Sequence, residues 1–404
     1  MDKQSLNELS LDAQQGIKMH TSELITLLLI MLLLFISMHA LAQDEFAGFP
    51  EPQAAFQEHI VEVQRYLLGT QMSQRSAADV QYNLPFERKA STDVSYRGKF
   101  LLIHGLNDSP YVFTDVATAL VKRGFDVRAI LLPGHGSTPK AQLNITAERW
   151  LNAAREHLAL WHQDNTVPMY LGGFSMGAVI ATTMALETEN IAGLLLFSPA
   201  YKSRMNHMLR WASLYSRFKP WVFGGMIIED NPTKYNSIPI NGAAQYYKLA
   251  QILKKRLRTQ KLEMPILAVA SVDDSVVDVG HFIQVFSKKF TSPQKRLILY
   301  SNTQPYDEVV STDYRKSAFP DLRILNQSHQ GVIVAPDNPL FGTNGRVLVC
   351  NGNDWPTFSA CLYSTQRHWY GAQHTQSPDE APVARTTYNP DFFSVFEAFD
   401  AVFR

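Results

Sequence analysis

The 404-residue sequence has few of the features that mark metal-binding, disulfide-rich or nucleic-acid-binding proteins. It contains two cysteines, Cys350 and Cys361, without the additional histidine or cysteine ligands, at close spacing, that a zinc site needs. No block of five or more consecutive Lys or Arg residues occurs, and 37 basic residues balance 37 acidic ones, so nucleic acid is not expected as a partner. No internal repeat is present. These absences favour an ordinary globular chain without a metal site.

One segment near the start is not typical of a globular domain. Residues 24–42 form an apolar run in which His39 is the one residue able to carry a charge, nearly long enough to span a bilayer. Small residues at Ala40 and Ala42 resemble a signal-peptidase site, but the preceding segment is not positively charged. Residues 1–43 are therefore predicted to be a signal peptide or a signal-anchor. A buried core helix is the other reading of the run.

The charges around this run predict its orientation. Lys18 precedes it, and no Lys or Arg follows until Arg65, so the positive-inside rule places the N-terminus in the cytoplasm. The rest of the chain is then extracytoplasmic, which is the periplasm if the source is bacterial. Residues 44–94 are read as a linker and an N-terminal helix near 55–69, and 95–404 as the main domain.

From about residue 98, short apolar runs alternate with helical patterns. This alternation predicts βαβ units and an α/β fold with a mostly parallel, doubly wound sheet. Strands are expected at 99–105, 125–134, 167–173, 191–199, 264–271, 295–301 and 322–328, with helices at 111–124, 146–161, 175–187, 243–258, 277–290 and 390–403. The alternation breaks at about 203–240, a stretch rich in Met, Trp, Phe and Tyr.

The stretch Gly173-Phe174-Ser175-Met176-Gly177 lies between a predicted strand and a predicted helix. This is the context of a G-x-S-x-G elbow, in which the glycines allow a sharp bend that exposes the serine hydroxyl. Backbone N–H groups at the start of the helix would favour a developing negative charge. Ser175 is therefore the candidate nucleophile.

A serine nucleophile needs a base and an acid, which follow it in the order acid, then histidine, in proteins with this elbow. Asp273, Asp274 and Asp278 follow a predicted buried strand, and each also suits turn or cap positions. His329 follows the last predicted strand and is the candidate base. The competing histidines are His207, His281, His368 and His374.

Two backbone N–H groups are candidates for an oxyanion hole. Met176 directly follows the nucleophile, and Leu106 follows the strand that ends at His104 and Gly105. His104 is expected to buttress that loop rather than to act in catalysis. His135, in the turn Pro133-Gly134-His135-Gly136, is likewise expected to form loop hydrogen bonds.

In this order, "HGL", "PGHG", "GFSMG" and "SVDDSVVD" resemble motifs of the α/β-hydrolase family. The most similar pattern is that of the lysophospholipases, monoacylglycerol lipases and bacterial carboxylesterases, over about residues 95–335. The resemblance selects Asp274 as the acid and implies a lid at about 203–240. Ser271 stands where the family usually has glycine, and the segments 302–320 and 336–388 are additions to its usual length.

The resemblance implies a serine hydrolase that cleaves carboxylic esters, with apolar, lipid-like substrates favoured by the lid composition. No metal or organic cofactor is needed. A serine aminopeptidase on the same fold is the first alternative, with Glu229 and Asp230 as the acids that would bind a substrate's amino group. A non-catalytic binding protein is the second. Outside the cytoplasm, Cys350 and Cys361 would be able to form a disulfide, and two free thiols are the alternative.

Overall fold

The computed structural model describes residues 26, 48–70, 76–164, 166–222, 224–306, 311–351 and 355–404. The chain divides into two units, Met1–Gly48 and Phe49–Arg404, and the fold described here is that of the second. Apart from Thr26, the apolar run 24–42 lies outside the described residues. Among those that are described, no helix has the length and apolar character needed to cross a membrane.

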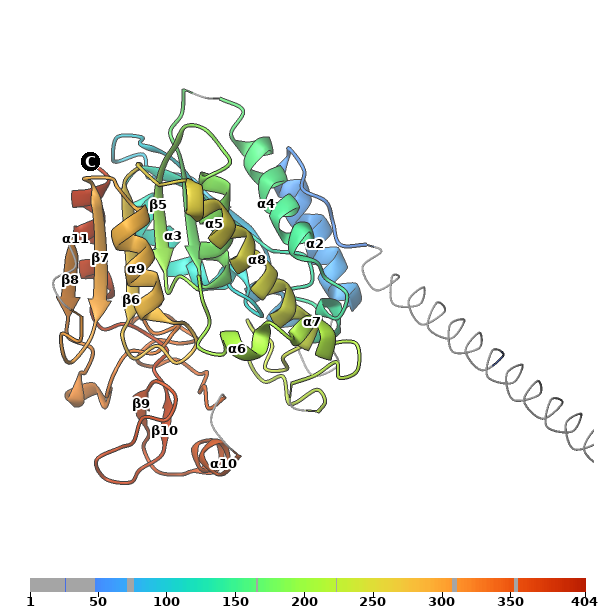
Figure 1. The fold of residues 1–404 in the computed structure, drawn as a ribbon, viewed down its shortest axis with the longest axis vertical. Coiled ribbons are helices and arrows are strands. Elements are labelled where there is room, and N and C mark those ends of the chain that lie inside the picture. Colours follow the sequence, from blue (N-terminus) through green and yellow to red (C-terminus); the bar gives the residue numbers. More distant parts are fainter. Residues whose placement is uncertain are drawn as a thin grey trace, which may run out of the picture. The chain divides into compact units, whose positions relative to one another are not determined.

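The centre of the fold is an eight-stranded sheet in the order β1-β3-β2-β4-β5-β6-β7-β8 (Figure 1). Strand β1 runs antiparallel to β3, and all the other neighbours are parallel. The inner strands consist almost entirely of buried residues because both faces of the sheet are covered. The strands are β1 Phe86–Arg88, β2 Gly98–Ile103, β3 Phe125–Ile130, β4 Met169–Phe174, β5 Ile191–Phe197, β6 Ile266–Ser271, β7 Lys295–Tyr300 and β8 Thr312–Arg315.

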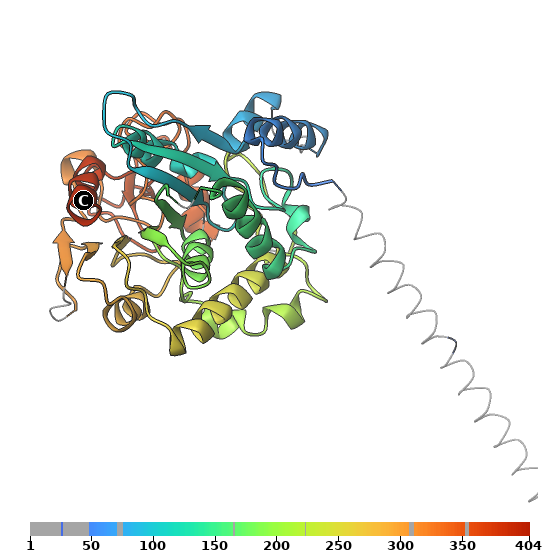
Figure 2. The same ribbon diagram turned by 90° about the horizontal axis from the view of Figure 1, so that it is seen from above.

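Helices pack on both faces of this sheet, so the predicted doubly wound α/β class is confirmed. Helices α3 (Thr114–Val121) and α11 (Phe392–Val402) share one apolar core with the sheet. Helices α4 (Ala147–Trp161), α5 (Met176–Ala185) and α8 (Ile240–Thr259) contact one another. Figure 2 shows α8 (yellow) and α11 (red) on different sides of the sheet. The remaining longer helices are α2 Phe56–Thr70, α9 Val279–Lys289 and α10 Trp355–Tyr363.

The sequence prediction was wrong at the edge of the sheet that precedes His329. Residues 322–328 were expected to form the last strand, but Leu322 ends a short 3₁₀ helix, Arg323 has a left-handed backbone with φ of 58°, and 325–328 have no regular structure. The last strand of the eight-stranded sheet is β8, which lies inside the 302–320 insertion and pairs in parallel with β7. Ile324 instead forms isolated bridges with Phe319 and Tyr370, so its apolar side chain is buried without a strand.

Two regions extend beyond the sheet and its helices. Residues 203–240 contain the short helices α6 (Asn206–Leu209) and α7 (Ala212–Tyr215), and are termed the cap. Residues 336–388 contain α10 and a two-stranded parallel ribbon of β9 (Trp369–Gly371) and β10 (Val383–Arg385), and are termed the lobe. A disulfide joins Cys350 and Cys361 within the lobe, and both residues pack against Ala384 of β10.

Candidate active site

Ser175 lies at the sharp turn between β4 and α5. Its backbone has φ of 56° and ψ of −118°, a region that a residue with a side chain rarely adopts. The two glycines of the motif make this turn possible by close packing. A Cβ atom at Gly177 would lie 1.8 Å from the carbonyl oxygen of Ile103, and one at Gly173 would lie 2.4 Å from the backbone nitrogen of Ala178. The predicted elbow is therefore present, and any side chain at either glycine would open it.

The structure brings Ser175, His329 and Asp274 together in one hydrogen-bonded chain. The Ser175 hydroxyl oxygen lies 2.8 Å from Nε2 of His329. Nδ1 of the same ring donates to Oδ2 of Asp274 at 2.6 Å. The Asp274 side chain is fully buried, whereas the His329 side chain keeps 16% of its surface exposed. The arrangement leaves Nε2 able to accept the serine proton while the carboxylate holds the tautomer.

In the acid loop after β6, residues 272–278, the three candidate aspartates have different partners. Oδ1 of Asp274 accepts hydrogen bonds from the backbone N–H groups of Val276 and Val277, at 2.8 and 3.1 Å. Asp273 points elsewhere and accepts a hydrogen bond from the Ser317 hydroxyl at 3.4 Å. Burial raises the pKa of the Asp273 carboxyl. Asp278 caps α9 by accepting from the backbone N–H of His281.

The loop that carries His329 is fixed by hydroxyl groups from the sheet. Ser198, just after β5, donates to the carbonyl oxygen of His329 at 2.7 Å. Ser271, the last residue of β6, donates to the carbonyl oxygen of Gln327 at 2.7 Å. Ser271 stands where the family that the sequence resembles usually has glycine. Its hydroxyl therefore gives the histidine loop a hydrogen bond that glycine would not supply.

The added segments support the same loop from its other side. The backbone N–H of Gln327 donates to the hydroxyl of Ser317, which follows β8. Thr386 of the lobe donates to the carbonyl oxygen of Asn326 and accepts from the hydroxyl of Ser328, both at 2.6 Å. Ser317, after β8, and Thr386 of the lobe therefore support the histidine loop. Ser198 and Thr386 have no sequence signal that would have singled them out.

The two predicted oxyanion donors come from different segments beside the elbow. Met176 is the first residue of α5, so its N–H has no acceptor within the helix. Leu106 follows Gly105, whose Cα lies so near Ser175 that an added Cβ would be 3.1 Å from the serine Cβ. His104 is fully buried and accepts from the backbone N–H of Leu132 at 3.0 Å through Nε2. His104 therefore fixes the base of the loop, as its sequence context suggested.

The cap joins the candidate site at both of its ends. At its start, Ser203 forms a bridge with Val277 of the acid loop. Near its end, the backbone N–H of Tyr235 donates to the carbonyl oxygen of Asn107 at 2.9 Å, next to Leu106. Nζ of Lys234 lies 2.7 Å from the Asp108 carboxylate, which is buried. This ion pair, which the sequence did not indicate, holds the cap to the loop that carries Leu106.

The acidic pair of the cap is engaged within the cap itself. The Glu229 side chain is buried and accepts from the backbone N–H groups of Asn236 and Ser237, at 2.7 and 2.8 Å. Asp230 accepts from the side-chain amide of Asn236 at 2.6 Å. Glu229 therefore organises the cap loop.

The competing histidines lie on other elements. His207 is on α6, His281 is on α9, and Nε2 of His368 bonds the carbonyl oxygen of Cys361 in the lobe. His374 follows β9 with a positive φ. Within the described ranges, no cluster of three or more His, Cys, Asp or Glu side chains is placed to hold a metal ion.

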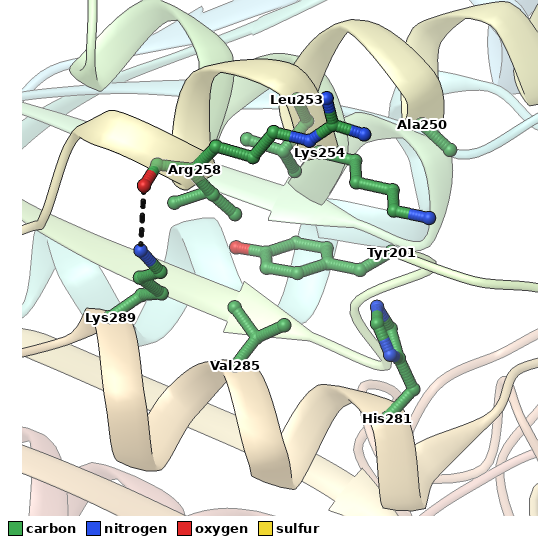
Figure 3. A pocket seen from close by; sticks show the side chains of 9 residues that line it. Tyr201, Ala250, Leu253, Lys254, Arg258, His281, Val285 and Lys289 are labelled. Carbon is green, nitrogen blue, oxygen red and sulfur yellow. Dashed lines mark hydrogen bonds between the residues drawn. The ribbon is translucent and has the colours of Figure 1, made fainter.

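A separate pocket of about 340 Å³ lies between α8 and α9, as Figure 3 shows. Tyr201 forms its floor, and its hydroxyl lies 2.5 Å from that of Thr182 on α5. Four basic side chains surround it: those of Lys254, Arg258, His281 and Lys289. None of Ser175, Asp274 and His329 lines this pocket, so it is not the place where the hydrogen-bonded chain would meet a substrate.

A mostly parallel eight-stranded sheet, with a Ser–His–Asp chain at the turn between a central strand and its helix, defines an α/β-hydrolase of the serine hydrolase class. Residues 95–304 match the model of the family described as serine aminopeptidase, S33. This match spans more than half of the chain, and the chain belongs to that family.

Individual relatives are more distant. A thermostable monoacylglycerol lipase from Bacillus sp. (strain H-257) is 23% identical over 224 residues, which cover 53% of this chain and 84% of the relative. A solved monoglyceride lipase from Saccharomyces cerevisiae is 16% identical with a TM-score of 0.43, over 54% of this chain and 82% of that one. A monoacylglycerol lipase from Paleococcus ferrophilus is 18% identical with a TM-score of 0.44, over 56% and 92%.

Protonation of a buried histidine beside the site should make stability depend on pH. His135 is fully buried, Nδ1 bonds the carbonyl oxygen of Pro133, and burial lowers its pKa to about 4 from 6.5. The unfolded chain therefore takes up the proton first as pH falls. We expect the free energy of unfolding to decline between pH 6.5 and about 4, with about 3 kcal/mol of the decline due to His135.

Denaturant unfolding of the wild type, His135→Gln and the exposed control His207→Gln, at several pH values, measures this slope. The His135→Gln slope should be smaller, and the control slope should match the wild type. Equal slopes in the wild type and His135→Gln would contradict the assignment, even if His135→Gln is less stable at every pH.

Proposed function

We propose that this protein hydrolyses carboxylic esters through an acyl-enzyme formed on Ser175. The observation that carries the proposal is the hydrogen-bonded chain from Ser175 through His329 to the buried Asp274. A serine at such an elbow is held clear of the sheet, where an ester carbonyl can approach it.

The proposed reaction has two halves that use the same groups. In the first, Oγ of Ser175 attacks the ester carbonyl while Nε2 of His329 takes the hydroxyl proton. The imidazolium then gives that proton to the leaving alcohol, and the acyl group remains on Ser175. In the second half, Nε2 takes a proton from water, the hydroxide attacks the acyl-enzyme, and the proton returns to Ser175 as the acid leaves. No metal ion or organic cofactor takes part in these steps.

The backbone N–H groups of Leu106 and Met176 are the proposed donors to the tetrahedral oxyanion. They lie on the two sides of the elbow, and the positive end of α5 adds to the same field. Donors placed before the reaction stabilise charge that develops only in the transition state, which lowers the barrier. The ion pair between Lys234 and Asp108 would hold the first donor in place.

The acidic and apolar groups of the cap favour esters as substrates over peptides with a free amino terminus. A serine aminopeptidase needs an acidic group aimed at the substrate's amine, and Glu229 already accepts two backbone hydrogen bonds. A relative of this chain is a monoacylglycerol lipase. The cap residues between Met205 and Ile228 are largely apolar and aromatic, which suits a substrate with an acyl chain. We therefore propose apolar, lipid-like esters as the substrate class.

We further propose that the enzyme works on the extracytoplasmic side, attached by residues 24–42 or released by cleavage after Ala42. The charge pattern around the apolar run supports this orientation. The disulfide between Cys350 and Cys361 supports it independently, because such bonds persist in oxidising compartments.

Labelling with a fluorophosphonate probe tests the nucleophile. The wild type should become labelled on the peptide that contains Ser175 and should hydrolyse short soluble esters. Ser175→Ala should lose both, with an unchanged unfolding midpoint, because the residue contributes little to packing. A label on another serine, or no label on a folded wild type, would contradict the proposed function and favour a non-catalytic binding protein.

The adjacent aspartates form a matched pair for testing the acid. Asp274→Asn should lower kcat by about 10⁴-fold, because the amide cannot hold the required imidazole tautomer. Asp273→Asn should change kcat far less, since Asp273 bonds Ser317 rather than His329. Both rates are measured on one soluble ester with unfolding curves as controls, and the reverse order would assign the acid to Asp273.

An alkaline phosphatase reporter fused after Ile60 tests the orientation, because that reporter needs an oxidising compartment. We expect an active fusion in a bacterial host. Retention in the membrane fraction after a high-salt wash indicates an anchor, and a soluble product that starts at Gln43 indicates cleavage. An inactive reporter confined to the cytoplasm would overturn the proposed location.

A further inference from the structure

Exposed apolar side chains are concentrated on one short stretch of the cap. Met205, Met208, Trp211, Leu214, Tyr215 and Phe218 each expose more than half of their surface, and Phe218 exposes 81%. They lie within the 14 residues from Met205 to Phe218, which include α6 and α7 and in which Ala212 is the one buried residue. The surface formed by the exposed residues of 204–219 is termed the cap face. Clusters of this kind on a soluble domain mark an interaction site.

The same part of the chain is strongly basic although the whole chain is neutral. Residues 202–262 hold twelve of the 37 lysines and arginines and two of the 37 acidic residues, a net charge of +10. Residues 202–228 contain no Asp or Glu at all. The remainder of the sequence is correspondingly acidic, so the charge is segregated rather than mixed.

The basic groups of the cap face are exposed beside the apolar ones. Arg204, Arg210, Arg217 and Lys219 are all exposed. Within the part of the chain that the structure describes, none of these four forms a salt bridge, whereas Lys202 at the start of the segment is paired with Asp278. Helix α8 contacts both α6 and α7. Lys254 and Arg258, which line the pocket of Figure 3, lie in the C-terminal half of α8 and are not part of the cap face.

The cap face is continuous with the candidate active site. The backbone N–H of Arg204 donates to the carbonyl oxygen of Val276 at 3.1 Å, and Val276 of the acid loop is itself 47% exposed. Val276 in turn donates its N–H to Asp274. A molecule that covers the cap face would therefore lie beside the loop that holds the candidate acid.

We propose that the cap face docks onto a bilayer surface that contains anionic phospholipids. Its apolar side chains enter the boundary between headgroups and acyl chains, and its four cations meet the headgroup phosphates. Charge complementarity selects this occupant, since a second copy of the cap face would meet the first with like charge. Nucleic acid would leave the apolar side chains without a partner. The docking does not depend on the reaction, but with the proposed function it brings the site to lipid esters.

A fluorescent reporter at Phe218, the most exposed apolar residue of the cap face, tests this in the full chain. Phe218→Cys supplies one free thiol for an environment-sensitive NBD label, because Cys350 and Cys361 are bridged. Phe393→Cys is the matched control, since Phe393 is 59% exposed on α11. The probes are phosphatidylcholine vesicles and vesicles with an equal share of phosphatidylglycerol. The label reports on its own position, so residues 24–42 do not decide the outcome.

The label at 218 should brighten several-fold and shift to shorter wavelength with the anionic vesicles, and much less with phosphatidylcholine alone. The added substitutions Arg217→Glu and Lys219→Glu, or high salt, should remove most of the response. No response at 218, equal responses to both lipids, or an equal response at 393 would overturn the proposal. A change that depends on protein concentration without vesicles would assign the surface to self-association instead.

Activity separates this proposal from the proposed function. The variant Arg217→Glu/Lys219→Glu should hydrolyse a soluble short ester at the wild-type rate and lose activity on an ester dispersed in anionic vesicles. An enzyme that is active on the soluble ester but gives no lipid response keeps the proposed function and loses the docking. A lipid response without labelling of Ser175 does the reverse.

Discussion

The packing of the start of α5 against the end of β2 is the constraint on which the candidate site depends. The carbonyl oxygen of Ile103 lies where a side chain at residue 177 would begin, so the helix can start there only with glycine. This close approach lets β4 turn directly into α5 and holds Ser175 at a positive φ. A residue in such a conformation costs roughly 1–3 kcal/mol, which the surrounding sheet must offset. The same approach places the loop after β2 beside the serine, and so brings Leu106 to the site.

The acid and the histidine that act with Ser175 are held at this turn by hydrogen bonds from several separate segments of the chain. The acid loop is fixed locally, because the Asp274 carboxylate accepts two N–H groups of its own loop. Within the histidine loop, the backbone N–H of Gly331 donates to the Ser328 hydroxyl at the longer distance of 3.4 Å. The loop is held by side-chain hydroxyls from β6, from the end of β5, from the residues after β8 and from the lobe. The segments that lengthen this chain therefore contribute to geometry at the histidine, whatever else they do.

Sequence patterns predicted the structure best where they follow directly from burial or from local backbone geometry. Buried parallel strands are nearly all apolar, so β2 to β7 could be predicted, and the glycines around Ser175 identified the elbow. Edge strands were not predictable: β8, Thr312–Arg315, is half-buried and polar, and β1 is three residues long. Residues 322–328 have the pattern of a strand but do not form one. Ile324 is instead buried through bridges with Phe319 and with Tyr370, which is distant in sequence. Serine and threonine are too common in loops for Ser198 or Thr386 to be recognised in advance.

The cap combines contacts to the candidate site with an uneven distribution of charge. It leaves the fold at the acid loop and returns at the loop that carries Leu106, tied there by Lys234 and Asp108. Burial raises the pKa of the Asp108 carboxyl, and the Lys234 ammonium opposes that shift. The tie between cap and site is thus a charge pair with a buried carboxylate, and removal of the Lys234 ammonium would leave the charge of Asp108 without this partner. The outward surface of the same segment carries exposed cations that form no salt bridge within the described residues. The cap therefore presents a neutralised ion pair toward the site and exposed cations toward solvent. Only these cations are available to a surface of opposite charge.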